Sequence, residues 1–367
     1  MMVRKSENKD ISRLNTFGMK VRAAMFIEYD CPEDMLRIDW ESLPQPILPV
    51  GECSNLLFTG DFRGTLLRSR VDGIHVDEGR SGGNEVFVRV GSGVGMDEFC
   101  QWAALKGLWG PENLSGIPGT VGASAVQNVG AYGVEACDVI DLVECFDIQD
   151  RTFVSFTNEE CAFGYRDSFF KQNRGRYVIL EVVYRLSGDF LPRLDYGNLR
   201  SEVDRNVELS MPASDPYRPL FGTGLGSQMP LSSMLVRDTV KAIRETKLPN
   251  PDKVGSAGSF FKNPVVEKAV FDRVEAVASG LGSGAVVPHF DLPDGKVKIP
   301  AAWLIDVCGF KGCRRGGAAV WEKQPLVIVN ATGRAVPEEI LSLEKEIVTR
   351  VFETFGVKLS PEVDHIG

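Results

Sequence analysis

Between residues 110 and 133 the chain carries a run dominated by small residues, which constrains its fold more than any other feature. Glycines recur at Gly116, Gly119 and Gly122 before the run ends at Gly133. Glycine lets a backbone approach a ligand closely and present its N–H groups, which suits a pyrophosphate. A surface loop would have the same composition. The run therefore predicts either a phosphate-binding cradle or a glycine-rich loop, and composition alone does not decide between them.

An apolar run over residues 85–90 predicts a strand that enters a turn at 91–95 and then a helix over 96–105. The turn is similar to a dinucleotide-binding fingerprint. However, its third glycine falls at Gly95 rather than one residue later, and no βαβ repeat follows. An ordinary tight turn is the favoured interpretation. Further strands are predicted at 23–27, 45–50, 56–58, 139–147 and 177–186.

The last third of the chain predicts a mixed helical and strand unit. The stretch over residues 202–235 is poor in periodicity and rich in proline and glycine, so a long connection or an inserted subdomain at a domain boundary is expected there. Helices are predicted over 235–245, 266–278 and 301–308 and from Pro337 to a stop at Gly356, and strands over 296–299 and 326–329.

Bulk composition excludes several classes of protein. The 367 residues carry a net charge of -9 without a Lys/Arg run, so the footprint of a nucleic-acid-binding protein is missing. The eight cysteines form no CxxC pair and only three histidines occur, which argues against a metal site, a disulfide framework or a Ser-His-Asp triad. No signal peptide and no apolar run of about 20 residues are seen. We therefore expect a cytoplasmic protein with reduced thiols, no metal and no membrane partner.

Several motifs then follow one another in a fixed order. They are GECSN at 51–55, ENLSGIPG at 112–119, QNVGAYG at 127–133, FGYRDS at 163–168, TKLPNP at 246–251, GSAGSFFKNP at 255–264, AWLID at 302–306, GGAA at 316–319 and PEV at 361–363. In this order the chain resembles the UDP-N-acetylenolpyruvoylglucosamine reductase family, over about residues 15–367 and in the branch with a tyrosine-bearing substrate loop. Motifs of this length in register are more specific than a single glycine pattern.

The resemblance implies an α+β fold, in which a two-lobed FAD-binding domain of the PCMH (vanillyl-alcohol-oxidase) type precedes an α/β substrate-binding domain. The domains expected on this basis are lobes at 1–80 and 81–210, a connection or inserted segment at 211–245 and the substrate-binding domain at 246–367. The implied cofactors are FAD and NADPH. The implied reaction reduces UDP-N-acetylglucosamine enolpyruvate to UDP-N-acetylmuramate for peptidoglycan synthesis. A monomer is the preferred oligomeric state.

Three catalytic residues are implied by the same resemblance. Ser259 would donate a proton to the substrate in the second half-reaction, after NADPH has reduced the flavin. Arg166 and Glu362 would stabilise the enolate-like intermediate. On residue type alone Ser259 would be a helix cap or turn serine, and Arg166 would form a salt bridge with Asp167 or with a surface carboxylate. Glu362 would be a solvated residue near the chain end.

The resemblance also implies residues that bind substrate and cofactor. A lysine suits a diphosphate and tyrosine hydroxyls suit phosphate or sugar oxygens, whereas residue type alone predicts a surface lysine and packing tyrosines. The implied substrate-binding residues are Tyr165, Tyr196, Lys247 and Asn263. The implied cofactor-binding residues are Gly51, Glu52, Cys53, Ser54, Asn55, Ile117, Pro118, Gly119, Gly122, Ala123, Ser124, Gln127, Asn128, Gly130 and Tyr132.

The chain departs from the family pattern at a few positions. Cys53 stands where the flavin loop usually has glycine, and Asp364 and His365 stand where relatives often have a basic and an apolar residue. Two other hypotheses are a different FAD oxidoreductase acting on an alcohol or sugar, and a non-catalytic flavin or sugar-nucleotide binding protein. The first gives no reason to keep the catalytic trio together, and the second would be expected to lose one of its members. A bound flavin, and NADPH oxidation that requires the enolpyruvyl substrate, discriminate among the three.

Overall fold

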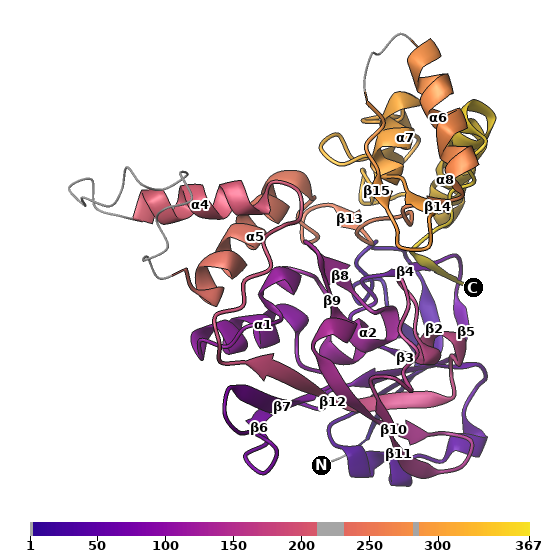
Figure 1. The fold of residues 1–367 in the computed structure, drawn as a ribbon. Helices are drawn as coiled ribbons and strands as arrows, with labels where there is room; N and C mark the ends of the chain where they lie inside the picture. Colours follow the sequence, from indigo (N-terminus) through magenta and orange to yellow (C-terminus); the bar gives the residue numbers. More distant parts are fainter. Residues whose placement is uncertain (1–2, 211–230, 282–285) are drawn as a thin grey trace. The chain divides into compact units, whose positions relative to one another are not determined.

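The structure, a computed structural model, describes residues 3–210, 231–281 and 286–367 (Figure 1). The chain divides into two compact units. Unit 1 comprises Met1–Glu7, Met25–Glu52 and Gly64–Arg244. Unit 2 comprises Asn8–Ala24, Cys53–Arg63 and Glu245–Gly367, so two short N-terminal segments belong with the C-terminal third.

A five-stranded antiparallel sheet lies at the centre of unit 1, in the order β11-β10-β12-β7-β6. Helices α1 (Met96–Leu105) and α2 (Val121–Gln127) pack against it through a shared core that includes Phe99, Ala125 and Val182 (Figure 1). The strands are β6 (Ile74–Val76), β7 (Glu85–Gly91), β10 (Ile140–Asp147), β11 (Thr152–Thr157) and β12 (Tyr177–Ser187). Short elements of unit 1 are η2 (Trp40–Ser42), η3 (Glu112–Leu114), η4 (Ala136–Asp138), α3 (Phe169–Gln172), β8 (Gly130–Ala131) and β9 (Val134–Glu135).

The turn between β7 and α1 is an ordinary one. Strand β7 ends at Gly91 and pairs antiparallel with both β6 and β12, and α1 begins at Met96. A dinucleotide-binding unit needs parallel strands joined by a helix. The tight-turn interpretation of residues 91–95 is therefore confirmed.

A second sheet has the order β1-β2-β5-β3, in which β3 and β5 are parallel. Its strands are β1 (Arg4–Asp10), β2 (Arg22–Tyr29), β3 (Ile47–Val50) and β5 (Phe62–Ser69). The predicted strands at 23–27, 45–50, 56–58, 85–90, 139–147, 177–186, 296–299 and 326–329 correspond to β2, β3, β4 (Leu56–Phe58), β7, β10, β12, β16 (Val297–Lys298) and β19 (Ile328–Asn330).

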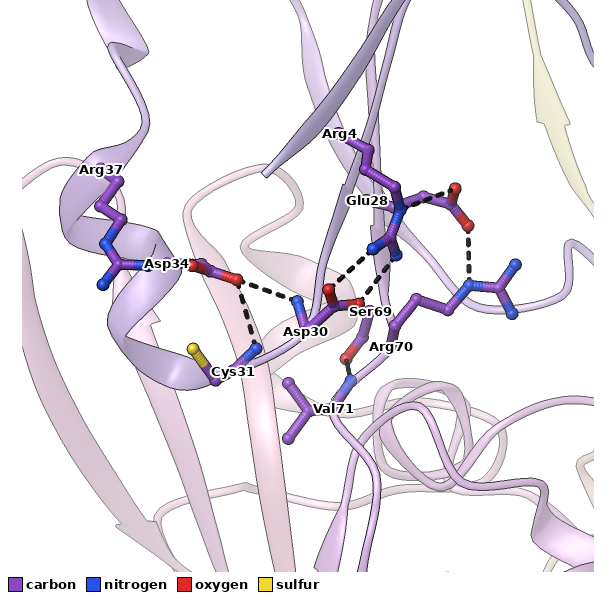
Figure 2. Close-up of polar contacts among 9 residues, drawn as sticks. All are labelled: Arg4, Glu28, Asp30, Cys31, Asp34, Arg37, Ser69, Arg70 and Val71. Atoms are coloured by element: carbon purple, nitrogen blue, oxygen red, sulfur yellow. Dashed lines mark hydrogen bonds and ion pairs between the residues drawn. The ribbon is translucent and has the colours of Figure 1, made fainter. Parts of the chain in front are cut away.

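The end of β2 in unit 1 is fixed by a polar network (Figure 2). Arg4 donates through both terminal nitrogens to the Asp30 carboxylate, at 2.7 and 2.8 Å. Asp34, on η1 (Pro32–Arg37), accepts the backbone N–H groups of Asp30 and Cys31 at 3.0 and 3.4 Å. Burial alone would raise the pKa of Asp34, but these donors outweigh burial and lower it. The charged carboxylate therefore stabilises the turn from β2 into η1.

Two helices reach into the stretch at 202–235, for which a long connection or an inserted subdomain is predicted. Helix α4 (Leu199–Ser210) and helix α5 (Ser233–Lys247) pack together through a small core that includes Val203 and Val240 (Figure 1). Residues 202–210 and 233–235 are therefore helical, and residues 211–230 lie outside the described ones. The apolar residues of α4 recur every fourth position among charged ones, a helical period that the proline-rich continuation obscures.

Unit 2 combines small sheets with three helices, α6 (Lys268–Gly280), α7 (Ala301–Val307) and α8 (Pro337–Phe355). Helix α6 begins two residues later than predicted because Val265–Val266 pairs with β16 instead. No helix in the described ranges has the length and apolar character that a membrane span requires. The sheet orders are β13-β19-β18-β17, β14-β16-β15 and β20-β4. The remaining strands are β13 (Gly255–Ser256), β14 (Val265–Val266), β15 (Phe290–Asp291), β17 (Arg314–Arg315), β18 (Ala318–Val320) and β20 (Asp364–Ile366).

Candidate active site

In unit 1, Tyr165 and Arg166 form the tip of a tight turn. Its ends are closed by two backbone hydrogen bonds, from Gly164 N to Asp167 O at 3.0 Å and from Asp167 N to Gly164 O at 3.1 Å. Arg166 has φ 56°, in the left-handed region, which costs a non-glycine residue about 1–2 kcal/mol. Strain of this kind clusters at functional sites. The guanidinium carbon lies 5.2 Å from the centre of the Tyr165 ring, so the turn presents the two predicted residues together.

The Arg166 guanidinium is held by the 127–133 motif and the residues after it. One terminal nitrogen donates to Gly130 O at 2.7 Å and the other lies 3.6 Å from a carboxylate oxygen of Glu135. Glu135, whose side chain is 35% exposed, is a carboxylate of the kind that residue type alone predicts as a salt-bridge partner for Arg166. A methyl group added at Gly130 would lie 2.8 Å from the guanidinium, so only glycine permits this approach.

Further hydrogen bonds connect the same two motifs. Asn128 Nδ2 donates to Gly164 O at 2.9 Å. Lys171 Nζ donates to Gln127 Oε1 at 2.6 Å and to Arg166 O at 3.3 Å. The predicted cofactor motif and the predicted arginine motif thus meet in unit 1. Lys171 was missed because nothing in its sequence context distinguishes it from a surface lysine.

The loop at residues 51–55 contributes Gly51 and Glu52 to this region of unit 1. Glu52 Oε2 accepts the N–H of Gly119 at 3.1 Å, which joins two predicted cofactor segments. A methyl group added at Gly51 would lie 2.6 Å from Thr120 Oγ1 and 3.1 Å from Ala123 Cβ. The loop therefore approaches the start of α2 as closely as its backbone allows.

Buried polar atoms around the small-residue run have no hydrogen-bond partner among the described residues. They are Glu112 Oε1, Asn113 Oδ1, Ser115 Oγ and Gln127 Nε2. Burial raises the pKa of Glu112, although its other oxygen accepts the N–H of Gly110 at 2.6 Å. Unpartnered buried groups are costly unless a ligand or water satisfies them. The run has the donors and acceptors of a ligand cradle, which favours that prediction over a surface loop.

Gly116, inside the small-residue run, is fixed from two sides by residues that the sequence did not single out. Asp97 Oδ1 accepts the N–H of Gly116 at 2.8 Å, and Arg244 Nε donates to Gly116 O at 3.1 Å. Burial opposes the charge of Asp97, but Lys241 at 2.7 Å and the Gly116 N–H outweigh it, so the pKa of Asp97 is lowered. Burial lowers the pKa of Arg244. Only the long-range packing of α5 reveals these contacts.

Tyr196 lies beside the same motif. Its ring meets Tyr132 edge to face at 6.1 Å, and its side chain is 45% exposed. Tyr132 has φ 50°. Burial raises the pKa of Tyr132, and Arg244 opposes that shift. The predicted substrate tyrosine thus contacts the predicted cofactor motif, with its face partly open to solvent.

In unit 2 the backbone brings the predicted proton donor and the predicted carboxyl together. Glu362 N donates to Phe260 O at 2.8 Å, and Phe261 bridges Pro361. The side chains of Phe260 and Phe261 are fully buried, whereas Ser259 and Glu362 are half-buried. The two aromatic residues therefore anchor this segment and leave Ser259 at the edge of the core.

Ser259 does not cap a helix. It follows Gly258, which has φ 71°, and precedes Phe260, whose N–H donates to Leu326 O at 2.7 Å. The next helix along the chain begins at Lys268. Of the two roles expected from residue type, helix cap or turn serine, the helix cap is wrong, and Ser259 follows a left-handed glycine in a turn.

The loop at residues 51–55 continues into unit 2, where Asn55 contacts Glu362. Asn55 Nδ2 donates to Glu362 O at 3.1 Å, and Asp364 N donates to Asn55 O at 3.0 Å. Strand β20 then runs parallel to β4. Cys53 has φ 51°, a conformation that favours glycine, which fits the expectation that the family pattern has glycine at this position.

The two remaining predicted substrate residues are also in unit 2. Lys247 is exposed at the end of α5, and its carbonyl accepts the indole N–H of Trp321 at 3.1 Å. Asn263 Oδ1 accepts the N–H of Ala301, the first residue of α7, at 2.9 Å. The sequence did not identify Trp321, because nothing about an isolated tryptophan indicates which backbone group its indole will contact.

Comparison with known proteins agrees with this geometry. The family model described as UDP-N-acetylenolpyruvoylglucosamine reductase, C-terminal domain, matches residues 250–366, and the FAD binding domain matches residues 41–156. A UDP-N-acetylenolpyruvoylglucosamine reductase of Bacteroides fragilis is 38% identical over 354 residues, covering 96% of this chain and 97% of the relative. The chain belongs to the UDP-N-acetylenolpyruvoylglucosamine reductase family. The resemblance drawn from the motifs is confirmed.

A second relative supports the family assignment, and a solved structure supports the fold. The reductase of Neisseria meningitidis serogroup A is 41% identical over 357 residues, covering 96% of this chain and 95% of the relative. The crystal structure of the enzyme from Thermus caldophilus covers 100% of both chains with a TM-score of 0.62 at 22% identity. That likeness, together with the matched FAD binding domain, confirms the predicted α+β fold with an FAD-binding part.

Proposed function

We propose that this protein uses FAD and NADPH to reduce UDP-N-acetylglucosamine enolpyruvate to UDP-N-acetylmuramate, a peptidoglycan precursor. The observation that carries the proposal is the fastening of the Glu362 backbone to both the Ser259 segment, at 2.8 Å, and the flavin loop, at 3.1 Å. A mere flavin-binding protein gives no reason for that convergence. We further propose a cytoplasmic monomer that acts on small molecules.

The residues of the cradle fit FAD. Gly51, Glu52 and the segments at 117–124 and 127–132 provide a closely approached backbone, and Gln127 Nε2 is a buried polar atom without a partner among the described residues, which suits a pyrophosphate and a flavin ring. Cys53, Ser54 and Asn55 would complete the set of cofactor-binding residues. Bound FAD supplies hydride that originates from NADPH. The protein supplies position, charge stabilisation and the proton.

Three side chains are assigned to the reduction of the enolpyruvyl group. As hydride adds to the terminal vinyl carbon, the electron pair of the double bond moves toward the carboxylate. Arg166 binds this carboxylate while its charge grows, and Glu362, when its carboxyl group carries a proton, donates a hydrogen bond to the enolate. Ser259 Oγ gives its proton to the neighbouring carbon and regains one from solvent. The product is a saturated lactyl ether. Tyr165, Tyr196, Lys247 and Asn263 are assigned to the sugar nucleotide.

Purified protein tests the activity directly. We expect a bound flavin, and NADPH oxidation that continues beyond one equivalent per flavin only when the enolpyruvyl sugar nucleotide is added. One control omits the enolpyruvyl substrate. A second control measures oxygen consumption with an alcohol or a sugar, which an oxidase of such substrates would show. A flavin-loaded protein that leaves the enolpyruvyl substrate unreduced would refute the proposal.

Gly51→Ala is expected to weaken FAD binding. The added methyl group would lie 2.6 Å from Thr120 Oγ1, and overpacking of this kind costs about 1–3 kcal/mol. If this cost falls on the FAD-bound state, the FAD dissociation constant rises by about 5- to 150-fold. Titration of apoprotein with FAD measures it. Gly60→Ala is the matched control, because nothing lies within 4 Å of its added methyl group. Equal affinity in both variants would show that Gly51 does not shape the cradle.

A further inference from the structure

The terminal strand of unit 2 is joined to helix α8 by one side-chain pair. His365, on β20, places Nε2 3.2 Å from Oε2 of Glu344, whose side chain is 13% exposed. The imidazole is 32% exposed, and its ring lies 6.0 Å from that of the fully buried Phe260. His365 therefore contacts both α8 and the aromatic residue that follows Ser259.

Strand β20 is short, so an additional side-chain contact stabilises its position. It has three residues and pairs with the three residues of β4 in a two-stranded parallel sheet. Isolated two-stranded sheets are marginal, and parallel pairing is slightly weaker per residue than antiparallel pairing. The backbone hydrogen bonds of Glu362, to Phe260 and from Asn55, lie just before this strand. A shift of β20 would therefore move Glu362 directly.

We propose that His365 and Glu344 form a clamp that positions Glu362 for reduction of the substrate. The clamp holds β20 against α8, and the imidazole packs toward Phe260, whose carbonyl binds the Glu362 N–H. His365 is a positioning residue in this arrangement. The inference rests on the function proposed above for Glu362, and it adds two residues that the motifs did not include.

The clamp has a defined pH dependence. The hydrogen bond to Glu344 raises the pKa of His365, while burial opposes the shift. The charged groups that face the imidazole are Glu344 on α8 and Asp364 on its own strand, whereas β4 and Phe260 contribute apolar side chains. Because the folded pKa is raised, the stabilisation is complete below the unfolded pKa of about 6.5 and is lost as pH rises through the folded pKa.

Stopped-flow measurement of the two half-reactions, across neutral and alkaline pH, tests the clamp. His365→Ala is expected to slow substrate reduction about 10-fold, less than the roughly 100-fold that a 1 Å misplacement can cost, and to leave flavin reduction by NADPH unchanged. His365→Gln keeps a hydrogen-bond donor that does not titrate. It is expected to restore most of the rate and to remove the pH-dependent step. A parallel loss in both half-reactions, or no loss in either, would overturn the proposal.

A structural readout separates this inference from the proposed function. Amide hydrogen exchange over residues 362–366 is expected to accelerate in His365→Ala and in Glu344→Gln. Glu346→Gln is the matched control on the same helix, because it breaks an exposed ion pair with Arg315 at 2.7 Å. If the wild-type protein reduced no enolpyruvyl substrate, the proposed function would be refuted. The hydrogen-exchange measurement would still test whether His365 and Glu344 hold β20 in place. Unchanged exchange in both clamp variants would overturn it.

Discussion

Ser259→Ala is expected to lower the rate of substrate reduction about 10³-fold and to leave flavin reduction by NADPH nearly unchanged. A positioned general acid typically contributes about 10²–10⁴-fold, and the serine hydroxyl is the proton donor that we assign to the second half-reaction only. The backbone of this segment is held by Phe260 N to Leu326 O at 2.7 Å, a bond that the substitution leaves intact. Stopped-flow absorbance of the flavin resolves the two half-reactions.

The matched control for this variant is Ser360→Ala. Ser360 is exposed, and its carbonyl accepts the N–H of Lys262 at 2.9 Å, so it belongs to the same backbone contact without a role in catalysis. We expect both of its half-reactions to match the wild type. If Ser259→Ala slowed both half-reactions equally, the serine would matter for the architecture of the segment, and its assignment as proton donor would be wrong.

The sequence predicted most of the elements because their local patterns are strong. Helix α8 is an example: Pro337 at its start, Gly356 at its end and apolar residues such as Ile347 on one face agree with the structure. Helix α4 was missed because its apolar face is narrow and its continuation is rich in proline. The division into two units could not be predicted, since short segments at 8–24 and 53–63 join the C-terminal third through pairing over long sequence distances.

The candidate site, too, depends on long-range contacts that the sequence does not predict. Ordered motifs identified Arg166, Ser259 and Glu362, but residue type alone assigned each of them an ordinary structural role. The contacts that distinguish them are long-range, such as Asn55 to Glu362, which are 307 positions apart. Supporting residues such as Lys171 carry no motif. Their function depends on which backbone they meet, and a single sequence does not contain that information.

Arg166→Gly is expected to separate stability from activity. Loss of the guanidinium removes the assigned partner of the substrate carboxylate, and removal of one such preorganised group typically costs about 10²–10³-fold in rate. The same change relieves the strain of the left-handed backbone at φ 56°, which stabilises the fold by about 1–2 kcal/mol. The loss of the contacts with Gly130 and Tyr165 destabilises it and offsets that gain. We therefore expect a melting temperature close to that of the wild type and a severely slowed second half-reaction.

Arg151→Gly makes the comparison decisive. Arg151 also has φ 56° and also places its guanidinium over an aromatic ring, that of Trp40 at 5.6 Å, yet it lies in an exposed turn between β10 and β11. The two variants thus relieve the same strain and lose a similar stacking contact. If only Arg166→Gly slows substrate reduction, the guanidinium charge of Arg166 is needed for that step, which explains why the strained backbone is kept there. If Arg166→Gly retains full activity in both half-reactions, that arginine is not the carboxylate's partner. Arg166→Lys refines the result, because a lysine keeps the charge without the two-pronged geometry and should recover only part of the rate.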